Sequence, residues 1–198
     1  MEHKEADKAK QMLTIRTGEL AFTDEEYQKL LEAAQSYEDK LLLLIGVGYG
    51  MRRLDLVGIR IADIHLAGPA AGDQSTITFY ENKKRRHRVL PVGPRMEQEL
   101  RLYLNRLEST RKRREYLFPF RSRAAYDHLQ RLCELAGIPR RPFHAMRATC
   151  IKRAQRKGWT VEETAKWVGD TIRVVQEHYT TPSNQEMVEV NREKEIAY

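Results

Sequence analysis

His144, Arg147 and Tyr179 are the side chains of this sequence whose types and spacing best suit joint chemistry. His144 and Arg147 are three residues apart, so a helix would place both on one face. Tyr179 ends a later helical stretch, where its hydroxyl could act as a nucleophile. A guanidinium can bind two phosphate oxygens at once, and an imidazole can accept a proton near neutral pH. Together the three could form part of a catalytic site, although each also has an ordinary structural role as a helix cap, a helix-surface arginine or a packed tyrosine.

The composition favours a polyanionic partner. The 198 residues carry a formal net charge of +7, with a pI near 9.4. Nucleic acid is the commonest polyanion, and an acidic membrane surface is the competing interpretation. The longest apolar run, 41–47, is far short of the roughly 20 residues that span a bilayer, and the charged N-terminus is unlike a signal peptide. Cys133 and Cys150 have no metal-ligand spacing, which suits a reducing cytoplasm. We therefore expect a cytoplasmic protein without membrane contact.

The elements that must position these side chains form one mainly helical α+β domain. Thr23 and Glu26 have capping-box spacing and should begin the first helix. The segment 37–48 is apolar nearly all round, as expected for a central buried helix. Other helical patterns cover 54–57, 96–107, 124–136 and, weakly, 185–196.

A basic hairpin is the clearest β signal. Residues 75–80 (STITFY) alternate as a strand, 81–86 (ENKKRR) form a turn, and 87–92 (HRVLPV) return. Isoleucines at 59, 61 and 64 predict entry into an earlier strand. The expected sheet is therefore small, with about three antiparallel strands.

Four segments resemble, in family order, the motifs of the tyrosine recombinase (phage integrase) family. GMRRLDLVGIRIADI at 50–64 is similar to the first arginine box, and NKKRRHRVLPV at 82–92 to the hairpin that carries the catalytic lysine. FHAMRATC at 143–150 is similar to the His-x-x-Arg box, and VGDTIRVVQEHYT at 168–180 to the segment that ends in the nucleophile. Each motif alone is common, but four in order over residues 20–185 are specific.

The resemblance implies the fold and the organisation of the chain. It implies the tyrosine recombinase catalytic-domain fold, with a small antiparallel three-stranded sheet, over residues 21–181. Residues 1–20, which lack a helical or strand period, would be a flexible lead-in or the remnant of a linker, too short for the family's N-terminal domain. Residues 182–198 would be a tail that docks on a neighbouring subunit or folds back on its own domain.

The resemblance also implies an activity. This is site-specific cleavage and rejoining of double-stranded DNA through a 3′-phosphotyrosyl intermediate, for DNA integration or recombination, without metal or nucleotide cofactor. The enzyme would act as a tetramer on DNA, with a monomer as the alternative state of the free chain, and would associate with the nucleoid. Three other functions remain open: a catalytically impaired DNA-binding relative, a type IB topoisomerase, and a plain basic nucleic-acid-binding protein.

Five residues take catalytic roles by this resemblance. Tyr179 would be the nucleophile, Arg52 and Arg147 would clamp the phosphate, and Lys83 would protonate the leaving 5′-oxygen. His144 would take the tyrosine proton or hydrogen-bond the phosphate. Plainer interpretations stand beside these roles. They are a tyrosine packed in the core with Ile172 and Val175, a helix-capping His144, and Arg53 or Lys84 in place of Arg52 or Lys83.

Two acidic residues and the rest of the hairpin complete the expected site. Asp55 would hold an Arg or His in place. Asp170 stands where the family has His or Trp, and an ionised carboxylate would repel a phosphate. Its simplest role is to cap a helix that starts at Thr171, with Lys166, Thr171 or Arg173 as a compensating donor. The side chains expected to face DNA are Lys84, Arg85, Arg86 and Arg88.

Overall fold

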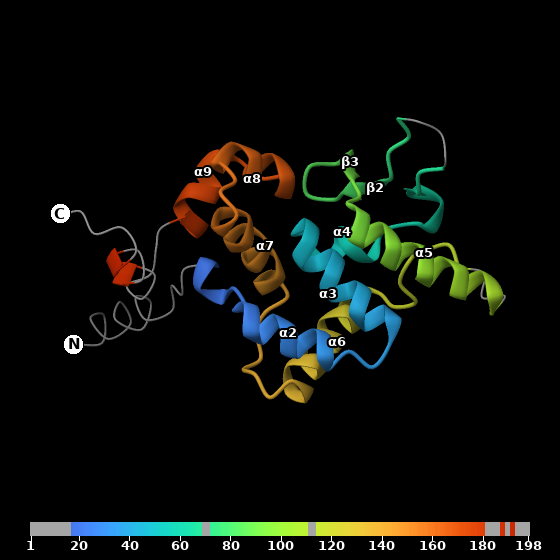
Figure 1. Cartoon of the computed structure of the whole chain (residues 1–198), viewed down its shortest axis with the longest axis horizontal. Helices are drawn as coiled ribbons and strands as arrows, with labels where there is room; N and C mark the ends of the chain where they lie inside the picture. The colour runs from blue at the N-terminus through green and yellow to red at the C-terminus, as the bar shows by residue number, and fades with distance from the viewer. Residues whose placement is uncertain (1–16, 69–71, 111–113, 181–186, 189–190, 193–198) are drawn as a thin grey trace, which may run out of the picture.

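The structure is a computed structural model that describes residues 17–68, 72–110, 114–180, 187–188 and 191–192 (Figure 1). The expected lead-in at 1–20 lies outside the described residues, except for a 3₁₀ turn at Thr17–Leu20. Most of the weak helix expected at 185–196 also lies outside them. None of the helices in the described part combines the length and the apolar character needed to cross a membrane.

The helical framework expected from the sequence is confirmed, with ends shifted by a few residues. The Thr23–Glu26 capping box is formed in both directions, and it begins the first of these helices. The helices are α2 (Asp24–Glu32), α3 (Tyr37–Tyr49), α4 (Arg53–Val57), α5 (Pro94–Ser109), α6 (Ser122–Leu135), α7 (His144–Arg156), α8 (Val161–Val168) and α9 (Ile172–Val175). A single π-helical turn, Gln176–Thr180, follows α9 directly.

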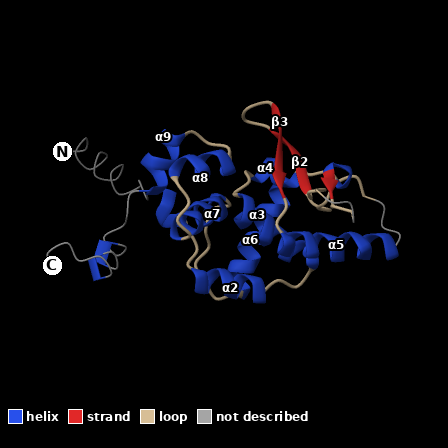
Figure 2. Ribbon diagram, turned by 45° about the horizontal axis from the view of Figure 1, so that its top comes forward, coloured by secondary structure: helices blue, strands red, loops and turns tan. Residues whose placement is uncertain are grey.

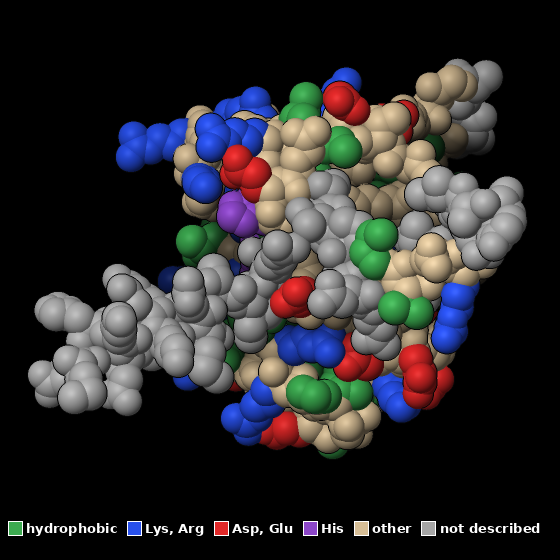
Figure 3. Space-filling model, turned by 90° about the vertical axis from the view of Figure 1, so that its left-hand side faces the viewer, with side chains coloured by type: hydrophobic (Ala, Val, Ile, Leu, Met, Phe, Trp, Pro, Cys, Tyr) green, Lys and Arg blue, Asp and Glu red, His purple; other side chains and the backbone are tan. Residues whose placement is uncertain are grey.

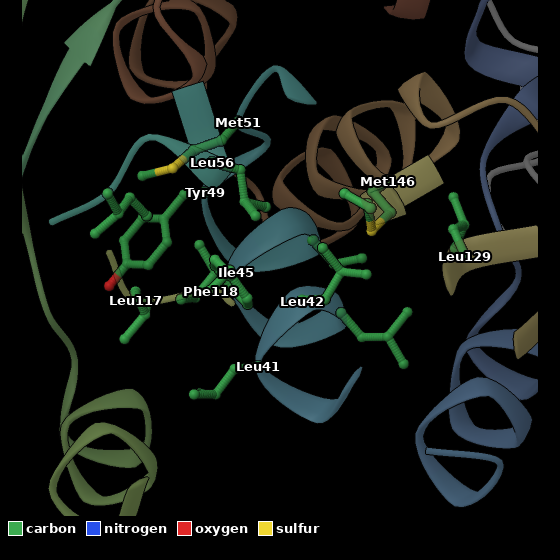
Figure 4. Packing of buried hydrophobic residues seen from close by; sticks show 14 of the residues in the cluster. Leu41, Leu42, Ile45, Tyr49, Met51, Leu56, Leu117, Phe118, Leu129 and Met146 are labelled. Carbon is green, nitrogen blue, oxygen red and sulfur yellow. The ribbon is translucent and has the colours of Figure 1, made fainter. Parts of the chain in front are cut away.

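Helix α3 is the centre of the core, as its apolar sequence predicts. Leu41, Leu42 and Ile45 are fully buried, and Figure 4 shows side chains from other segments gathered around them. Helix α7 packs closely against α3, and Met146 fills the space beside Gly46. The first residues of α7 are therefore fixed against the most buried part of the molecule.

The sheet contains β1 (Ile64–His65), β2 (Thr76–Glu81) and β3 (Arg86–Pro91), antiparallel and in that order. The hairpin is confirmed, but the early strand is shorter than expected. The carbonyl of Ile59 accepts from the N–H of Leu117, and the N–H of Ile61 donates to the carbonyl of Glu115. Ile61–Asp63 forms a 3₁₀ turn, so only Ile64 and His65 pair with β2. In Figures 1 and 2 the turn of the hairpin lies beside α8.

A second, smaller apolar cluster joins α7 to the C-terminal helices. It contains Cys150 and Ile151 of α7, Val168 of α8, Val175 of α9 and Tyr179. The 3₁₀ turn at Thr17–Leu20 packs against α7 and the π-helical turn. The tyrosine is thus held on two sides by packed backbone.

The end of α3 generates a stability prediction. Gly50 ends the helix with a φ of 59°, and a Cβ there would lie 3.0 Å from a methyl carbon of Val168. We expect Gly50→Ala to destabilise the protein by about 1–2 kcal/mol in urea unfolding, because L side chains are strained in left-handed backbone. Gly48→Ala is the control, since it is exposed and its Cβ would make only an ordinary contact, 3.5 Å from Met96. The control should be neutral or up to about 1 kcal/mol more stable. Equal losses in both variants would contradict this interpretation.

Candidate active site

Arg147 lies at the centre of the candidate site and is almost completely buried. Its Nη1 donates to the backbone carbonyls of Gly50 and Val168, both at 2.7 Å, and its Nη2 donates to Asp170 Oδ2 at 2.6 Å. These two carbonyls belong to the ends of α3 and α8, where helices leave acceptors unsatisfied. The Nε of Arg147 is also buried, and it has no partner among the described residues. Buried donors in folded proteins nearly always have a hydrogen-bond partner, so this one marks an unusual position.

Asp170 bridges the two arginines that the sequence assigned to the phosphate. Its Oδ2 lies 3.5 Å from Arg52 Nη2 as well as 2.6 Å from Arg147 Nη2. Burial alone would raise the pKa of Asp170, but the hydrogen bond and charge of Arg147, with the charge of Arg52, lower that pKa below its usual value. The carboxylate is therefore ionised at neutral pH.

The expected capping role of Asp170 is wrong. Helix α9 begins at Ile172, and its cap is Thr171, whose hydroxyl accepts from the backbone N–H of Val174 at 3.2 Å. Asp170 lies one residue before the cap, and its carboxylate binds the buried guanidinium of Arg147. Sequence alone could not separate the two roles, because both place an acidic residue just before a helix.

The side chains of Tyr179 and His144, the expected nucleophile and base, are in direct contact. The hydroxyl of Tyr179 contacts Nε2 of His144, and the tyrosine is 3% exposed. Burial, together with the charges of Arg147 and Arg52, lowers the pKa of His144 to about 4, so its imidazole is neutral. Burial raises the pKa of Tyr179, so the phenol keeps its proton and donates it to the imidazole. The imidazole of His144 thus contacts Tyr179 and does not cap α7.

The π-helical turn places this tyrosine. Gln176–Thr180 follows α9 without a break, and such turns occur frequently at functional sites. Tyr179 packs in the same cluster as Val175, as expected for a core residue, while its hydroxyl contacts His144. The two interpretations of this tyrosine are therefore compatible.

The root of the hairpin is fixed by two carboxylates. Glu81, fully buried, accepts from Arg52 Nη1 at 3.0 Å and from Arg86 Nε at 3.1 Å. Asp55 accepts from the backbone N–H and the side-chain amide of Asn82, at 3.0 and 2.9 Å. Asp55 therefore holds the hairpin turn, not an Arg or His as the sequence suggested.

Glu81 is the functional residue that the sequence analysis missed. A signal was present, because Ile77 and Phe79 point inward and the two-residue period of a strand places position 81 on the same face. A carboxylate on the buried face requires a cationic partner. Burial alone would raise the pKa of Glu81, but Arg86, Arg88 and Arg52 lower that pKa below its ordinary value.

Of the side chains expected to face DNA, Lys84, Arg85 and Arg86 are exposed, and Arg86 also donates to Glu81. Lys83, the expected proton donor, is exposed in the same turn and makes no hydrogen bond or ion pair with any described residue. Arg88 differs from the expectation, since its Nη2 donates to the carbonyls of Lys166 and Trp167 at 3.0 and 2.9 Å. Its guanidinium is thus engaged within the protein.

Positive charge at the site comes from side chains. Among the described residues, no group of three or more His, Cys, Asp or Glu is arranged to hold a metal ion. On the face shown in Figure 3, the Lys and Arg side chains lie beside acidic ones and do not form a continuous patch. Arg52 and Arg147 lie close enough to share Asp170, and their two planar guanidinium groups could together bind an anion.

The sequence matches a known protein family and several curated relatives. The model of the phage integrase family matches residues 21–186. Tyrosine recombinase XerA of Pyrococcus horikoshii is 29% identical over 126 residues, which are 63% of this chain and 41% of the relative. This chain spans less than two thirds of the length of the curated relatives that it matches.

Solved structures share the fold. The crystal structure of XerA recombinase superposes with a TM-score of 0.74 at 19% identity, covering 90% of this chain and 66% of that one. A lambda integrase tetramer bound to a Holliday junction gives a TM-score of 0.60 at 18% identity, covering 83% of this chain and 50% of that one. The helices and the small antiparallel sheet described above are therefore those of tyrosine recombinase catalytic domains.

The buried histidine generates a prediction about acid stability. The pKa of His144 is about 4 in the folded protein and near 6.5 when unfolded, so the unfolded chain takes up the proton first as the pH falls. The contribution of neutral His144 to the free energy of unfolding is fully present above about pH 6.5 and is lost progressively down to about pH 4. At about 1.4 kcal/mol per pKa unit, the loss is on the order of 3 kcal/mol.

Urea unfolding between pH 7 and pH 4 measures this loss. We expect the wild type to lose more stability over this range than His144→Gln, which keeps a polar group of similar reach but does not titrate. Identical pH slopes for the two proteins would contradict the lowered pKa of His144.

Proposed function

The chain belongs to the phage integrase family, and we propose that it cleaves and rejoins double-stranded DNA at specific sites through a bond between Tyr179 and a 3′-phosphate. The observation that carries this proposal is the convergence of the Tyr179–His144 pair with Arg147, whose buried Nε lacks a partner among the described residues. A phosphate oxygen would supply the missing acceptor. The nucleophile, its base and the anion-binding donor would then meet at one phosphorus atom.

In the proposed cleavage, each side chain has one role. Tyr179 passes its proton to His144, and the phenolate oxygen bonds to phosphorus as the bond to the 5′-oxygen breaks. Lys83 donates a proton to that departing oxygen, which leaves as a 5′-hydroxyl. Arg52 and Arg147 neutralise the charge that develops on the non-bridging oxygens, a contribution of about 3–4 kcal/mol for each donor in comparable sites.

Rejoining reverses these steps. A 5′-hydroxyl attacks the phosphotyrosine, and the phenolate leaves readily because the ordinary pKa of a phenol is near 10, far below that of an alcohol. His144 then returns the proton to Tyr179. The energy of the broken strand is kept in the covalent bond, so the cycle consumes no nucleotide.

The proposed partner is duplex DNA, bound by several copies of this chain. The lambda integrase neighbour is a tetramer on a Holliday junction. Strand exchange between two duplexes needs several cleavages, so we infer a tetramer for this chain as well. An enzyme with this substrate would work within the nucleoid.

Covalent trapping tests the proposal. On a duplex nicked close to the cleavage site, the departing fragment is lost and the adduct accumulates. We expect wild type to form a protein–DNA adduct that survives denaturing electrophoresis, and Tyr179→Phe to form none. His144→Gln should slow adduct formation by about 10²–10⁴-fold, the usual contribution of a general base.

Two further measurements make this test specific. Tyr116→Phe, at an exposed tyrosine, is the matched control and should react as wild type does. An adduct that persists in Tyr179→Phe would remove Tyr179 as the nucleophile, and relaxation of plasmids without any specific site would favour a topoisomerase.

Asp170 generates a separate prediction, because its carboxylate occupies the donors that a phosphate would use. We expect Asp170→Asn to bind DNA about tenfold or more tightly, since like charges brought together in an interface cost up to several kcal/mol. The free variant should be less stable by about 1–3 kcal/mol, because Arg147 loses its charged partner. Fluorescence anisotropy and thermal unfolding measure the two effects.

A matched control separates this effect from net charge. Asp127→Asn removes one negative charge from an exposed pair with Arg123 on α6. This control should alter DNA affinity by much less than Asp170→Asn. Equal changes in both variants would show that Asp170 acts only through the overall charge.

A further inference from the structure

Arg88 forms a link between the hairpin and the opposite side of the site. It lies on β3 opposite Phe79, and its guanidinium sits 5.4 Å from the centre of the Phe79 ring. From there it donates to the carbonyls of Lys166 and Trp167 in the last turn of α8. The turn that follows contains Gly169 and Asp170, and Asp170 binds both arginines of the site.

The contact is tight and electrostatically directed. The carbonyls of a last helical turn lack partners within the helix, and a cation is favoured there by the helix dipole. Gly169 has a φ of 71°, and a Cβ at this position would overlap Nη1 of Arg88 and lie 2.9 Å from Glu81 Oε1. The glycine thus lets two side chains of the hairpin approach the α8–α9 turn directly.

The charges around Arg88 argue against a merely incidental contact. Burial, together with the positive charges of Arg86, Arg147 and Arg52, lowers the pKa of Arg88, and Glu81 opposes this shift. Three guanidinium groups therefore lie close enough to repel that of Arg88. Arg88 keeps its place in this cluster through its two bonds to α8, so those bonds offset a real electrostatic cost.

The other attachments of the hairpin reach a different part of the site. Glu81 binds Arg52, and Asn82 binds Asp55 of α4. Both hold the hairpin to the α3–α4 side. Arg88 holds it to α8, and hence to the turn that contacts Arg147. Without Arg88, the hairpin would keep its contacts with Arg52 and Asp55. It would lose its bonds to α8, which fix its position relative to the turn that contacts Arg147.

We propose that Arg88 is a positioning residue: it holds the hairpin that carries Lys83 against the α8–α9 turn, so that the proton donor stays aligned with the phosphate bound by Arg147. This inference rests on the proposed function. It replaces the DNA contact that the sequence suggested for Arg88, and it predicts a defect in protonation of the leaving group with little loss of DNA affinity.

A sulfur substitution isolates that defect. In a nicked duplex with sulfur in place of the bridging 5′-oxygen, the leaving group is a thiol with an ordinary pKa near 8.5, and it departs as a thiolate without a proton donor. We expect Arg88→Met to cleave the oxygen substrate about 10- to 100-fold more slowly than wild type, part of the contribution of a general acid. Its cleavage of the sulfur substrate should be close to wild type, and its Kd for DNA should change by less than about twofold.

Three further variants control the comparison of cleavage rates on the oxygen and sulfur substrates. Lys83→Ala should be slow on oxygen and restored on sulfur. Arg123→Met removes the same charge from an exposed pair with Asp127 on α6, so the ratio of its oxygen and sulfur rates should equal that of wild type. Arg88→Lys keeps the charge but not the two-carbonyl geometry, and should lie between wild type and Arg88→Met. If thermal unfolding shows that Arg88→Met is not folded, Arg88→Lys is used for the test in its place.

The outcomes separate this inference from the function on which it rests. If Lys83→Ala is restored by sulfur and the Arg88 variants are not, the positioning role fails and the proposed function stands. If the Arg88 variants lose DNA affinity at an unchanged rate, Arg88 is a DNA contact. If wild type forms no adduct with either substrate, or Lys83→Ala is not restored, the role of Lys83 or the cleavage itself fails, and the inference falls with it.

Discussion

The buried guanidinium of Arg147 is the interaction on which the rest of the site depends. Removing an arginine from water costs several kcal/mol unless nearly all its donors are satisfied. Here two donors reach the carbonyls at the ends of α3 and α8, and a third reaches Asp170. Gly50 and Gly169 end those two helices in left-handed backbone. Two helix ends from distant parts of the sequence are thereby fixed around one charge.

Burial, assisted by the charges of Arg147 and Arg52, lowers the pKa of His144, and burial raises the pKa of Tyr179. With the phenol protonated and the pKa of His144 near 4, full transfer of the tyrosine proton is unfavourable in the free protein. A bound phosphate would offset the positive field of Arg52 and Arg147 and so raise the pKa of His144. The base would then gain strength when the substrate arrives. This coupling would limit formation of a reactive phenolate to the DNA-bound state.

The sequence predicted the parts of this site that depend on local patterns. The capping box, the helix pattern of α3 and the alternation of the hairpin are local, and the structure confirms them. The partners of Asp55, Glu81 and Arg88 could not be predicted in the same way. Each is set by how the hairpin lies against α4 and α8, which depends on contacts between residues tens of positions apart. The choice of Lys83 over Lys84 stays a prediction, because the hairpin turn presents both to solvent.

Asp170 shows how a residue that looks unfavourable in the sequence can be required by the fold. A carboxylate repels a phosphate, but in the free protein it offsets the charge of two guanidinium groups, one of them almost fully buried. A neutral histidine at this position could accept a hydrogen bond but could not offset that charge. The free enzyme would therefore be stabilised by the same anion that opposes the substrate, and DNA would have to displace the carboxylate or share the arginines with it. The Nε of Arg147 would give the incoming phosphate a first donor that Asp170 does not occupy.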